Sequence, residues 1–176
     1  MYKFSNKLIA ADNLIFDYFH NKIKSDFIDK FFILITHLGG FRFLTLLSLF
    51  CIFVRPNLNP VLGWELTAVL LSSHFFVHIL KRLINRKRPY EKLAGIENLV
   101  EPFESYSFPS GHTTASFAAA VTLSFAFPQL SILFIFTALL VAVSRIYLGV
   151  HYPSDILIGI VIALIFSFSI HSFLII

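Results

Sequence analysis

One short stretch near the end of the chain, SRIYLGVHYPSD, carries reactive side chains between two long apolar runs. His151 and Asp155 are four residues apart, a spacing that brings two side chains onto one helix face. The carboxylate can accept the imidazole N–H and fix its tautomer, which leaves the other ring nitrogen free as a nucleophile. Arg145 and Asp155 are the only Lys, Arg, Asp or Glu residues from Ser105 to Ile176. The stretch indicates a functional site, although a structural cap or a metal site also fits the His–Asp pair.

The composition places these residues in a membrane protein. Of 176 residues, 57% are hydrophobic and only 14% are charged, whereas soluble domains carry about 25% charged residues. The net charge of +4 does not indicate nucleic-acid binding, because the basic residues lie at the ends of apolar runs, where they can meet phosphate groups. The single Cys51 lies inside an apolar run and is expected to be a small buried side chain.

Five apolar segments are long enough, or nearly so, to cross a bilayer as helices. We therefore predict an all-α fold, a polytopic membrane helix bundle with about five transmembrane helices in one integral-membrane domain, residues 1–176. The first segment is interrupted by Gly39, Gly40 and Arg42 and is expected to break into two pieces. The segments are Phe27–Val54, Val61–Ile84, Gly111–Phe127, Leu130–Tyr147 and Pro153–Ile176.

The N-terminal residues predict an amphipathic helix rather than a signal peptide. Asp12, Asp17 and His20 interrupt any apolar signal core. From Phe4 to Ile23 the apolar side chains recur at helical spacing, which favours a helix lying in the membrane interface. They include Leu8, Ala11, Ile15, Tyr18 and Phe19.

The connections between the segments predict where the polar clusters meet. Short turns at Arg55–Pro60 and Phe127–Gln129 belong to one membrane face. The long segment Asn85–Ser110 and the link Gly149–Pro153 belong to the other. Three polar clusters that are far apart in the sequence can therefore converge on one face.

The first cluster, KRLINRKRP, places Lys81 and Arg88 seven residues apart, about two helical turns. Arginine offers a planar fork to phosphate oxygens and lysine a mobile point charge. A plain basic helix end, with its side chains reaching toward the interface, is the alternative.

The second cluster, SFPSGHTT, predicts the start of a helix with Ser110 as its N-cap. Gly111 leaves the first backbone N–H groups open, and such a helix start is a ready anion site. His112 would lie in the first turn beside the anion. A capped helix with an incidental histidine is the alternative.

A metal site is disfavoured where the three clusters meet. A dication held by two histidines and one aspartate would face the positive charges of Lys81, Arg88 and Arg145. The same cations can neutralise a phosphoryl group during its transfer. We therefore expect no metal and no other cofactor.

The three clusters together resemble the signature of the type 2 phosphatidic acid phosphatase superfamily, which includes lipid phosphatases and vanadium haloperoxidases. The matching residues are KxxxxxxRP from Lys81 to Pro89, PSGH from Pro109 to His112, and SRxxxxxHxxxD from Ser144 to Asp155. Haloperoxidase activity is disfavoured, because those relatives are soluble and this chain is expected to be almost wholly embedded in the membrane.

The resemblance implies a metal-independent phosphatase that forms a phosphohistidine. His151 would be the nucleophile, Asp155 its orienting partner, and His112 the acid that protonates the leaving oxygen. The phosphate would be held by Lys81, Arg88, Ser110, Gly111 and Arg145.

The expected partner is a phosphorylated membrane lipid. Small bacterial relatives act on undecaprenyl diphosphate, phosphatidylglycerophosphate or the lipid A 1-phosphate, and the residues of this chain do not separate the three. A non-catalytic lipid transporter or scaffold is the alternative, but binding alone requires neither His112, His151 nor Asp155.

Two further groups of residues have competing interpretations. His74 and His78 could line a substrate cavity or tune Lys81, but we expect them to be buried between helices with hydrogen-bond partners. The four glutamates from Glu91 to Glu104 could form a lid or a headgroup-recognition loop, but a solvated acidic loop is favoured.

The resemblance predicts a plasma-membrane protein with its site on the extracytoplasmic face. Most lysines and arginines lie on the site side, which the positive-inside rule would place in the cytoplasm. We retain the extracytoplasmic assignment, because part of that charge belongs to the expected phosphate site.

Overall fold

The computed structural model describes residues 6–53, 61–93, 95–96, 98–102 and 104–175. These residues form helices and connecting loops, with no strand among them. The expected turn at Arg55–Pro60 and the start of the N-terminal helix at Phe4 lie outside the described residues. The helices are α1 (Asn6–Asp17), η1 (Tyr18–Lys22), α2 (Asp26–Thr36), η2 (His37–Gly39), α3 (Phe41–Phe53), α4 (Leu62–Ile84), α5 (Pro89–Lys92), α6 (Gly111–Ala126), η3 (Pro128–Leu130), α7 (Ser131–Tyr147) and α8 (Pro153–Ile175).

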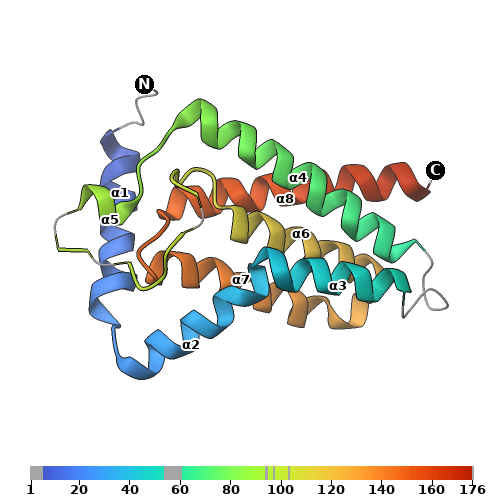
Figure 1. The fold of residues 1–176 in the computed structure, drawn as a ribbon, viewed down its shortest axis with the longest axis horizontal. Helices are drawn as coiled ribbons and strands as arrows, with labels where there is room; N and C mark the ends of the chain where they lie inside the picture. Colours follow the sequence, from blue (N-terminus) through green and yellow to red (C-terminus); the bar gives the residue numbers. More distant parts are fainter. Residues whose placement is uncertain (1–5, 54–60, 94, 97, 103, 176) are drawn as a thin grey trace.

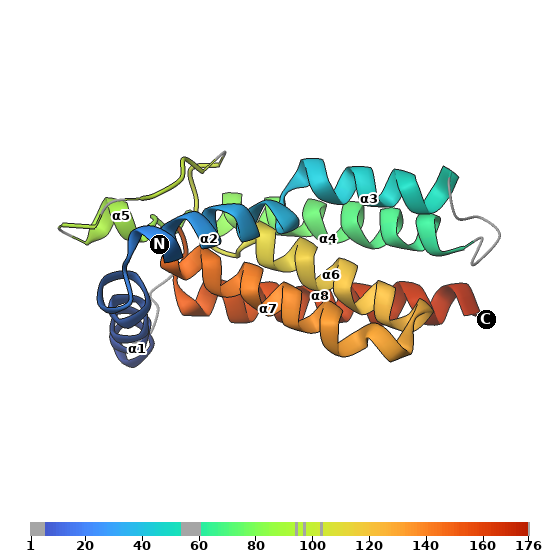
Figure 2. The same ribbon diagram turned by 90° about the horizontal axis from the view of Figure 1, so that it is seen from below.

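Helix α6 is the centre of the bundle and packs against α4, α7 and α8. These helices and α3 run along the long axis of the molecule, as Figures 1 and 2 show. Helix α6 is buried on several sides, because the consecutive residues Ala118, Ala119 and Ala120 point in different directions and are all buried. Small side chains let neighbouring helices approach closely, which is how membrane helices associate without a strong hydrophobic drive.

The helices have the lengths that a bilayer requires, with one exception. Three helical stretches, 62–92, 128–147 and 153–174, are long and apolar enough to cross a membrane. The pair α2–η2 and α3 counts as a fourth span if the two pieces form one bent crossing, with a bend of 47°. The predicted break in the first segment is thus confirmed. Helix α6 is the exception, because its 16 residues make it only about 24 Å long.

Helix α1 lies across the end of the bundle instead of along it (Figures 1 and 2). Leu14 and Ile15 on its outer side are exposed, as is Tyr18 at the start of η1, as an interfacial helix requires. Asp12 and Phe16 face the bundle and are buried. The amphipathic helix was predicted correctly, but the acidic residue that interrupts its apolar pattern faces the protein.

Two glycines let neighbouring elements approach the first turn of α6. A Cβ at Gly39 would lie 3.0 Å from the backbone oxygen of His112 and 2.5 Å from Cγ1 of Val141. A Cβ at Gly159 on α8 would lie 3.0 Å from the backbone oxygen of Ser110. The 2.5 Å contact is closer than a Cβ tolerates, and the two 3.0 Å contacts are tighter than most. The bend of the first span and the first half of α8 are therefore packed directly against the candidate site.

Candidate active site

The first cluster is turned back toward the bundle by the end of α4. Asn85 closes this helix in the left-handed region, with φ 50°, and donates its backbone N–H to the oxygen of Lys81. Asparagine is among the residues that tolerate this conformation. Lys81 is 3% exposed, and its Nζ donates to the oxygen of Tyr106 at 2.7 Å. The ammonium group is therefore held inside the protein and does not reach out to the interface.

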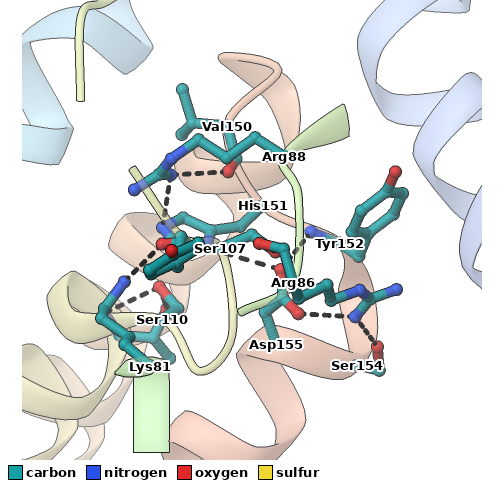
Figure 3. Close-up of polar contacts among 12 residues, drawn as sticks. Lys81, Arg86, Arg88, Ser107, Ser110, Val150, His151, Tyr152, Ser154 and Asp155 are labelled. Carbon is teal, nitrogen blue, oxygen red and sulfur yellow. Dashed lines mark hydrogen bonds and ion pairs between the residues drawn. The ribbon is translucent and has the colours of Figure 1, made fainter. Parts of the chain in front are cut away.

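Arg88 is buried beside His151 (Figure 3). Its Nε and Nη2 donate to the oxygen of Glu104 at 3.1 and 2.6 Å, and its Nη1 donates to the oxygen of Val150 at 2.8 Å. Nη1 also lies 3.4 Å from Nε2 of His151. A basic helix end would extend into solvent, so burial of both Lys81 and Arg88 favours the anion-binding interpretation.

The start of α6 has the cap that the sequence predicts. The Ser110 hydroxyl accepts from the backbone N–H of Thr113 at 3.4 Å and from its hydroxyl at 2.9 Å. The backbone N–H of Ser110 donates to the oxygen of Asp155 at 3.1 Å, which joins this turn to α8. A Cβ at Gly111 would meet only Cγ1 of Val77, at 3.9 Å. The packing therefore leaves room for an anion beside Gly111, whereas the amides of Ser110 and Thr113 already have partners.

Arg145 brings a third cation to the same place. It is 4% exposed, and its Nη1 donates to the hydroxyl of Thr36 on α2 at 2.7 Å. Its Nε has no hydrogen-bond partner among the described residues. A buried guanidinium N–H without a partner is costly, and a phosphate oxygen is the type of acceptor that would satisfy it.

His151 lies among these cations and is itself 2% exposed. Its burial lowers its pKa well below the ordinary value, and the charges of Arg88, Arg145 and Lys81 lower it further, in that order. His112 also acts on His151, so the three clusters converge as predicted. An imidazole that is neutral at pH 7 has the free lone pair that a nucleophile needs.

The contact between His151 and Asp155 is longer than the spacing suggests. Nδ1 of His151 lies 3.5 Å from Oδ2 of Asp155, an ion-pair distance beyond ordinary hydrogen-bond length. Oδ2 accepts the backbone N–H of Tyr152 at 2.9 Å, and Oδ1 accepts Nη1 of Arg86 at 2.6 Å. Contacts of this kind often tighten only when substrate binds. Asp155 is thus placed to orient His151 but is itself held by Arg86.

Sequence reasoning missed Arg86 and Asp12. Arg86 lies inside the first cluster, two residues before Arg88, and is 7% exposed at its side chain. Its Nη2 donates to Oδ2 of Asp12 at 2.6 Å. The only available signal for Asp12 was its presence in an otherwise apolar helix, and its partner lies 74 residues away.

The acidic loop is only partly solvated. Glu91 and Glu101 are exposed as expected, and Glu97 lies outside the described residues. Glu104 is different, because its carboxylate lies 3.2 Å from Nζ of Lys81 and 3.3 Å from Nδ1 of His78. Burial opposes its ionisation, but Lys81 and the bond from His78 lower its pKa overall. The charged carboxylate of Glu104 is therefore paired with Lys81, a cation that is expected to bind phosphate.

The interpretation of the two α4 histidines needs correction. His74 is exposed, and His78 is only half-buried. The buried stripe of α4 contains Val69, Ser73 and Val77, so both histidines lie one residue beyond it. His78 contacts Lys81 through the shared partner Glu104. Arg42 is exposed near the start of α3.

The side chains do not form an evident metal site. No group of three or more His, Cys, Asp or Glu side chains within the described part of the chain is placed to hold a metal ion. Three buried cations, Lys81, Arg88 and Arg145, act on His151 together with the single carboxylate of Asp155. This donor set fits a phosphate oxyanion better than a dication.

The sequence matches a family model described as the PAP2 superfamily over residues 62–174. The match includes all three polar clusters and more than half of the chain, and the chain therefore belongs to the PAP2 superfamily. The resemblance drawn from the three clusters is confirmed.

Several relatives of known name are phosphatases. The chain is 33% identical over 104 residues to a lipid A 1-phosphatase of Rhizobium etli, covering 56% of this chain and 44% of the relative. It is 36% identical over 88 residues to a decaprenylphosphoryl-5-phosphoribose phosphatase of Mycobacterium tuberculosis, covering 50% and 48%. It is 46% identical over 63 residues to an undecaprenyl-diphosphatase of Sulfolobus acidocaldarius, covering 35% and 31%. The chain spans less than half the length of each of these relatives.

Two solved structures share the whole fold. LpxE of Aquifex aeolicus superposes with a TM-score of 0.83 at 27% identity, covering 92% of this chain and 95% of that one. A transmembrane PAP2-type phosphatidylglycerolphosphate phosphatase of Bacillus subtilis superposes with a TM-score of 0.80 at 29% identity, covering 96% and 87%. The predicted membrane helix bundle is confirmed.

The orphan Nε of Arg145 leads to a first prediction. Replacing Arg145 with Lys keeps the charge but removes the planar fork, so phosphate loses a directed donor. We expect turnover to fall by tenfold or more, equivalent to about 1.4 kcal/mol. Arg82→Lys, on the exposed side of α4, is the matched control. Full turnover in the Arg145 variant, measured as phosphate release in detergent, would show that Arg145 only supports the bundle.

The ion pair of Glu104 leads to a second prediction. Glu104→Gln keeps the side-chain shape but leaves Lys81 without its counter-charge, so an anion should bind more tightly. We expect the inhibition constant of inorganic phosphate to decrease severalfold. Glu101→Gln, an exposed residue of the same loop, should leave it unchanged. Weaker phosphate inhibition in the Glu104 variant would mean that the carboxylate organises the site instead of competing for it.

Proposed function

We propose that this protein is a metal-independent membrane lipid phosphatase, formed by one integral-membrane domain over residues 1–176. It removes a terminal phosphate from a lipid through a phosphohistidine on His151. The observation that supports this most is the burial of three cations around a neutral, buried histidine. Lys81, Arg88 and Arg145 can neutralise the phosphoryl oxygens while His151 attacks.

The first step forms the phosphoenzyme. Nδ1 of His151 faces Asp155 and carries the proton, so Nε2 is left with a lone pair beside Arg88. Nε2 attacks phosphorus in line, and the bond between phosphorus and the lipid oxygen breaks. The leaving oxygen takes a proton from the His112 imidazolium, a form that the negative charge of the bound phosphate favours. The Ser110 hydroxyl and the backbone N–H of Gly111 bind the phosphoryl oxygens.

The second step releases phosphate. Neutral His112 accepts a proton from water, and the water oxygen attacks phosphorus. The bond between phosphorus and Nε2 breaks, inorganic phosphate leaves, and His151 is again neutral. The positive charge on the phosphorylated ring is stabilised by Asp155 throughout.

The substrate is a phosphorylated membrane lipid, for which we favour undecaprenyl diphosphate or phosphatidylglycerophosphate, with the lipid A 1-phosphate as the alternative. Relatives and solved neighbours carry names for each of these activities. All three substrates present a terminal phosphate on an apolar anchor. Phosphate release on a panel of the three, at equal mole fraction in mixed micelles, tests the choice.

We place the protein in the plasma membrane as a multi-pass protein with its site on the extracytoplasmic side. The helices and the membrane relatives support a multi-pass arrangement. The side of the membrane follows from the family resemblance, and the excess of basic residues at the site is partly explained by the buried phosphate-binding cations.

The two proposed histidine roles give a third prediction. His151→Ala should be inactive on lipid and on an activated aryl phosphate alike, because no phosphoenzyme can form. His112→Ala should lose far more activity on the lipid than on the aryl phosphate, since a low-pKa phenolate needs little protonation.

The wild-type reaction should continue in excess EDTA and be inhibited by vanadate.

The outcomes separate the alternatives. A wild-type protein that binds the lipid but releases no phosphate would support a binding protein instead of an enzyme. Loss of activity in EDTA that Zn²⁺ or Mg²⁺ restores would overturn the metal-free mechanism. Equal fractional losses of His112→Ala on both substrates, with chemistry rate-limiting, would make His112 a phosphate ligand and not an acid.

A fourth prediction concerns orientation. Glu101 is exposed and the native Cys51 is buried, so Glu101→Cys introduces an accessible thiol on the site side. We expect a membrane-impermeant maleimide to label this variant in intact cells and to leave the parent chain unlabelled. Labelling that requires cell lysis would place the site in the cytoplasm.

A further inference from the structure

We propose that Asp12 and Arg86 are a pair of positioning residues that hold Asp155 in place while leaving its negative charge available to His151. This inference rests on the proposed role of His151 as the nucleophile. It assigns a role in the reaction to the interfacial helix α1, which the three signature clusters do not include.

The geometry links α1 to the nucleophile through one guanidinium group. Nη1 of Arg86 donates to Oδ1 of Asp155 at 2.6 Å and to the hydroxyl of Ser154 at 2.7 Å (Figure 3). Nη2 donates to Oδ2 of Asp12 at 2.6 Å. The guanidinium carbon lies 4.0 Å from the centre of the Tyr152 ring, so the group is also fixed by a cation–π contact. Such contacts leave Arg86 little freedom to move.

Asp12 also binds the start of α8 directly. Its Oδ1 accepts the backbone N–H of Ser154 at 2.9 Å, and its Oδ2 accepts the Ser154 hydroxyl at 2.6 Å. The first N–H groups of a helix have no partner within the helix, and a carboxylate there is favoured by the helix dipole. Asp155 is the next residue, so this contact fixes the turn that carries it.

Charge balance explains why two carboxylates share one arginine. A buried Arg86–Asp155 pair alone would be neutral, and Asp155 would then do little to favour a positively charged imidazole at His151. Asp12, 3% exposed, returns one negative charge to the group. The trio of Asp12, Arg86 and Asp155 therefore carries a net charge of −1 in a buried environment. His151 becomes positively charged when its Nε2 is phosphorylated, and it lies 3.5 Å from this trio.

The matched variants separate charge from shape. Asp12→Asn removes the charge with little change in shape, and Asp12→Glu keeps the charge with a longer side chain. Asp17→Asn is the control, because Asp17 is exposed on the same helix and accepts a hydrogen bond from the nearby Asn21 side chain. Each variant is assayed in detergent for turnover, for inhibition by inorganic phosphate, and for the pH dependence of kcat/KM.

We expect Asp12→Asn to lower kcat tenfold or more while the inhibition constant of inorganic phosphate stays within about threefold, since the phosphate clamp is untouched. Asp12→Glu should retain more turnover than Asp12→Asn, and Asp17→Asn should match the wild type. Loss of a negative charge near His151 disfavours its protonated form, so the acidic limb of kcat/KM should move to lower pH. The other charged groups facing His151 are unchanged in the variant and are Lys81, Arg88, His112, Arg145 and Asp155.

Two results would overturn the inference. Wild-type turnover in Asp12→Asn would show that Asp12 has no part in the reaction. Equal losses of kcat and of phosphate affinity in Asp12→Asn and Asp12→Glu would show that Asp12 only supports the fold.

If Asp12→Asn does not fold, Arg86→Lys provides the test, because it keeps the charge and breaks the link between the two carboxylates. It should lower kcat tenfold or more at unchanged phosphate inhibition, and unaltered kcat would reject the pair. A wild-type protein without phosphatase activity would reject the proposed function itself, which is a separate result.

Discussion

Three positive charges are buried close together at one end of this bundle, and much of the surrounding chain is arranged to keep them there. Like charges repel, and burial removes the water that would screen them. The loop before α6 compensates with backbone oxygens, from Tyr106 to Lys81 and from Glu104 to Arg88. Thr36 on α2 provides an acceptor for Arg145. The cations thus require loops and spans from opposite ends of the sequence to meet at one place, and this requirement gives the site its shape.

The start of the central helix sets the depth of the site. In the first turn of α6, Ser110, Thr113 and Thr114 are buried, whereas Gly111 and His112 are half-buried. Close packing at Gly39 and Gly159 holds that turn between the bent first span and α8. A phosphate bound there would lie near the membrane surface while an attached lipid chain remained among the helices, which is the arrangement that an amphipathic substrate needs.

Much of the fold and of the site could be predicted because the relevant signals are local. Apolar runs, the Ser110 cap and the four-residue spacing of His151 and Asp155 each depend on neighbours in the sequence. The contact between Asp12 and Ser154 joins residues 142 positions apart, and no local pattern marks it. The outward direction of His74 was also missed, because the buried face of α4 is decided by packing against α6 and α8. Local chemistry was therefore visible in the sequence, whereas the partners that hold it in place depend on tertiary packing.

The docking of α1 onto α8 has a consequence for biogenesis. Asp12 is synthesised 142 residues before Ser154, the residue whose backbone and hydroxyl it binds. Until α8 has entered the membrane, Asp12 and Arg86 lack the helix start and the Asp155 carboxylate that they bind in the folded structure. His151, the proposed nucleophile, precedes α8 in the chain and has no Asp155 beside it until α8 is in place. Membrane insertion from the N-terminus thus leaves the candidate site unassembled until α8 packs against α4 and α6.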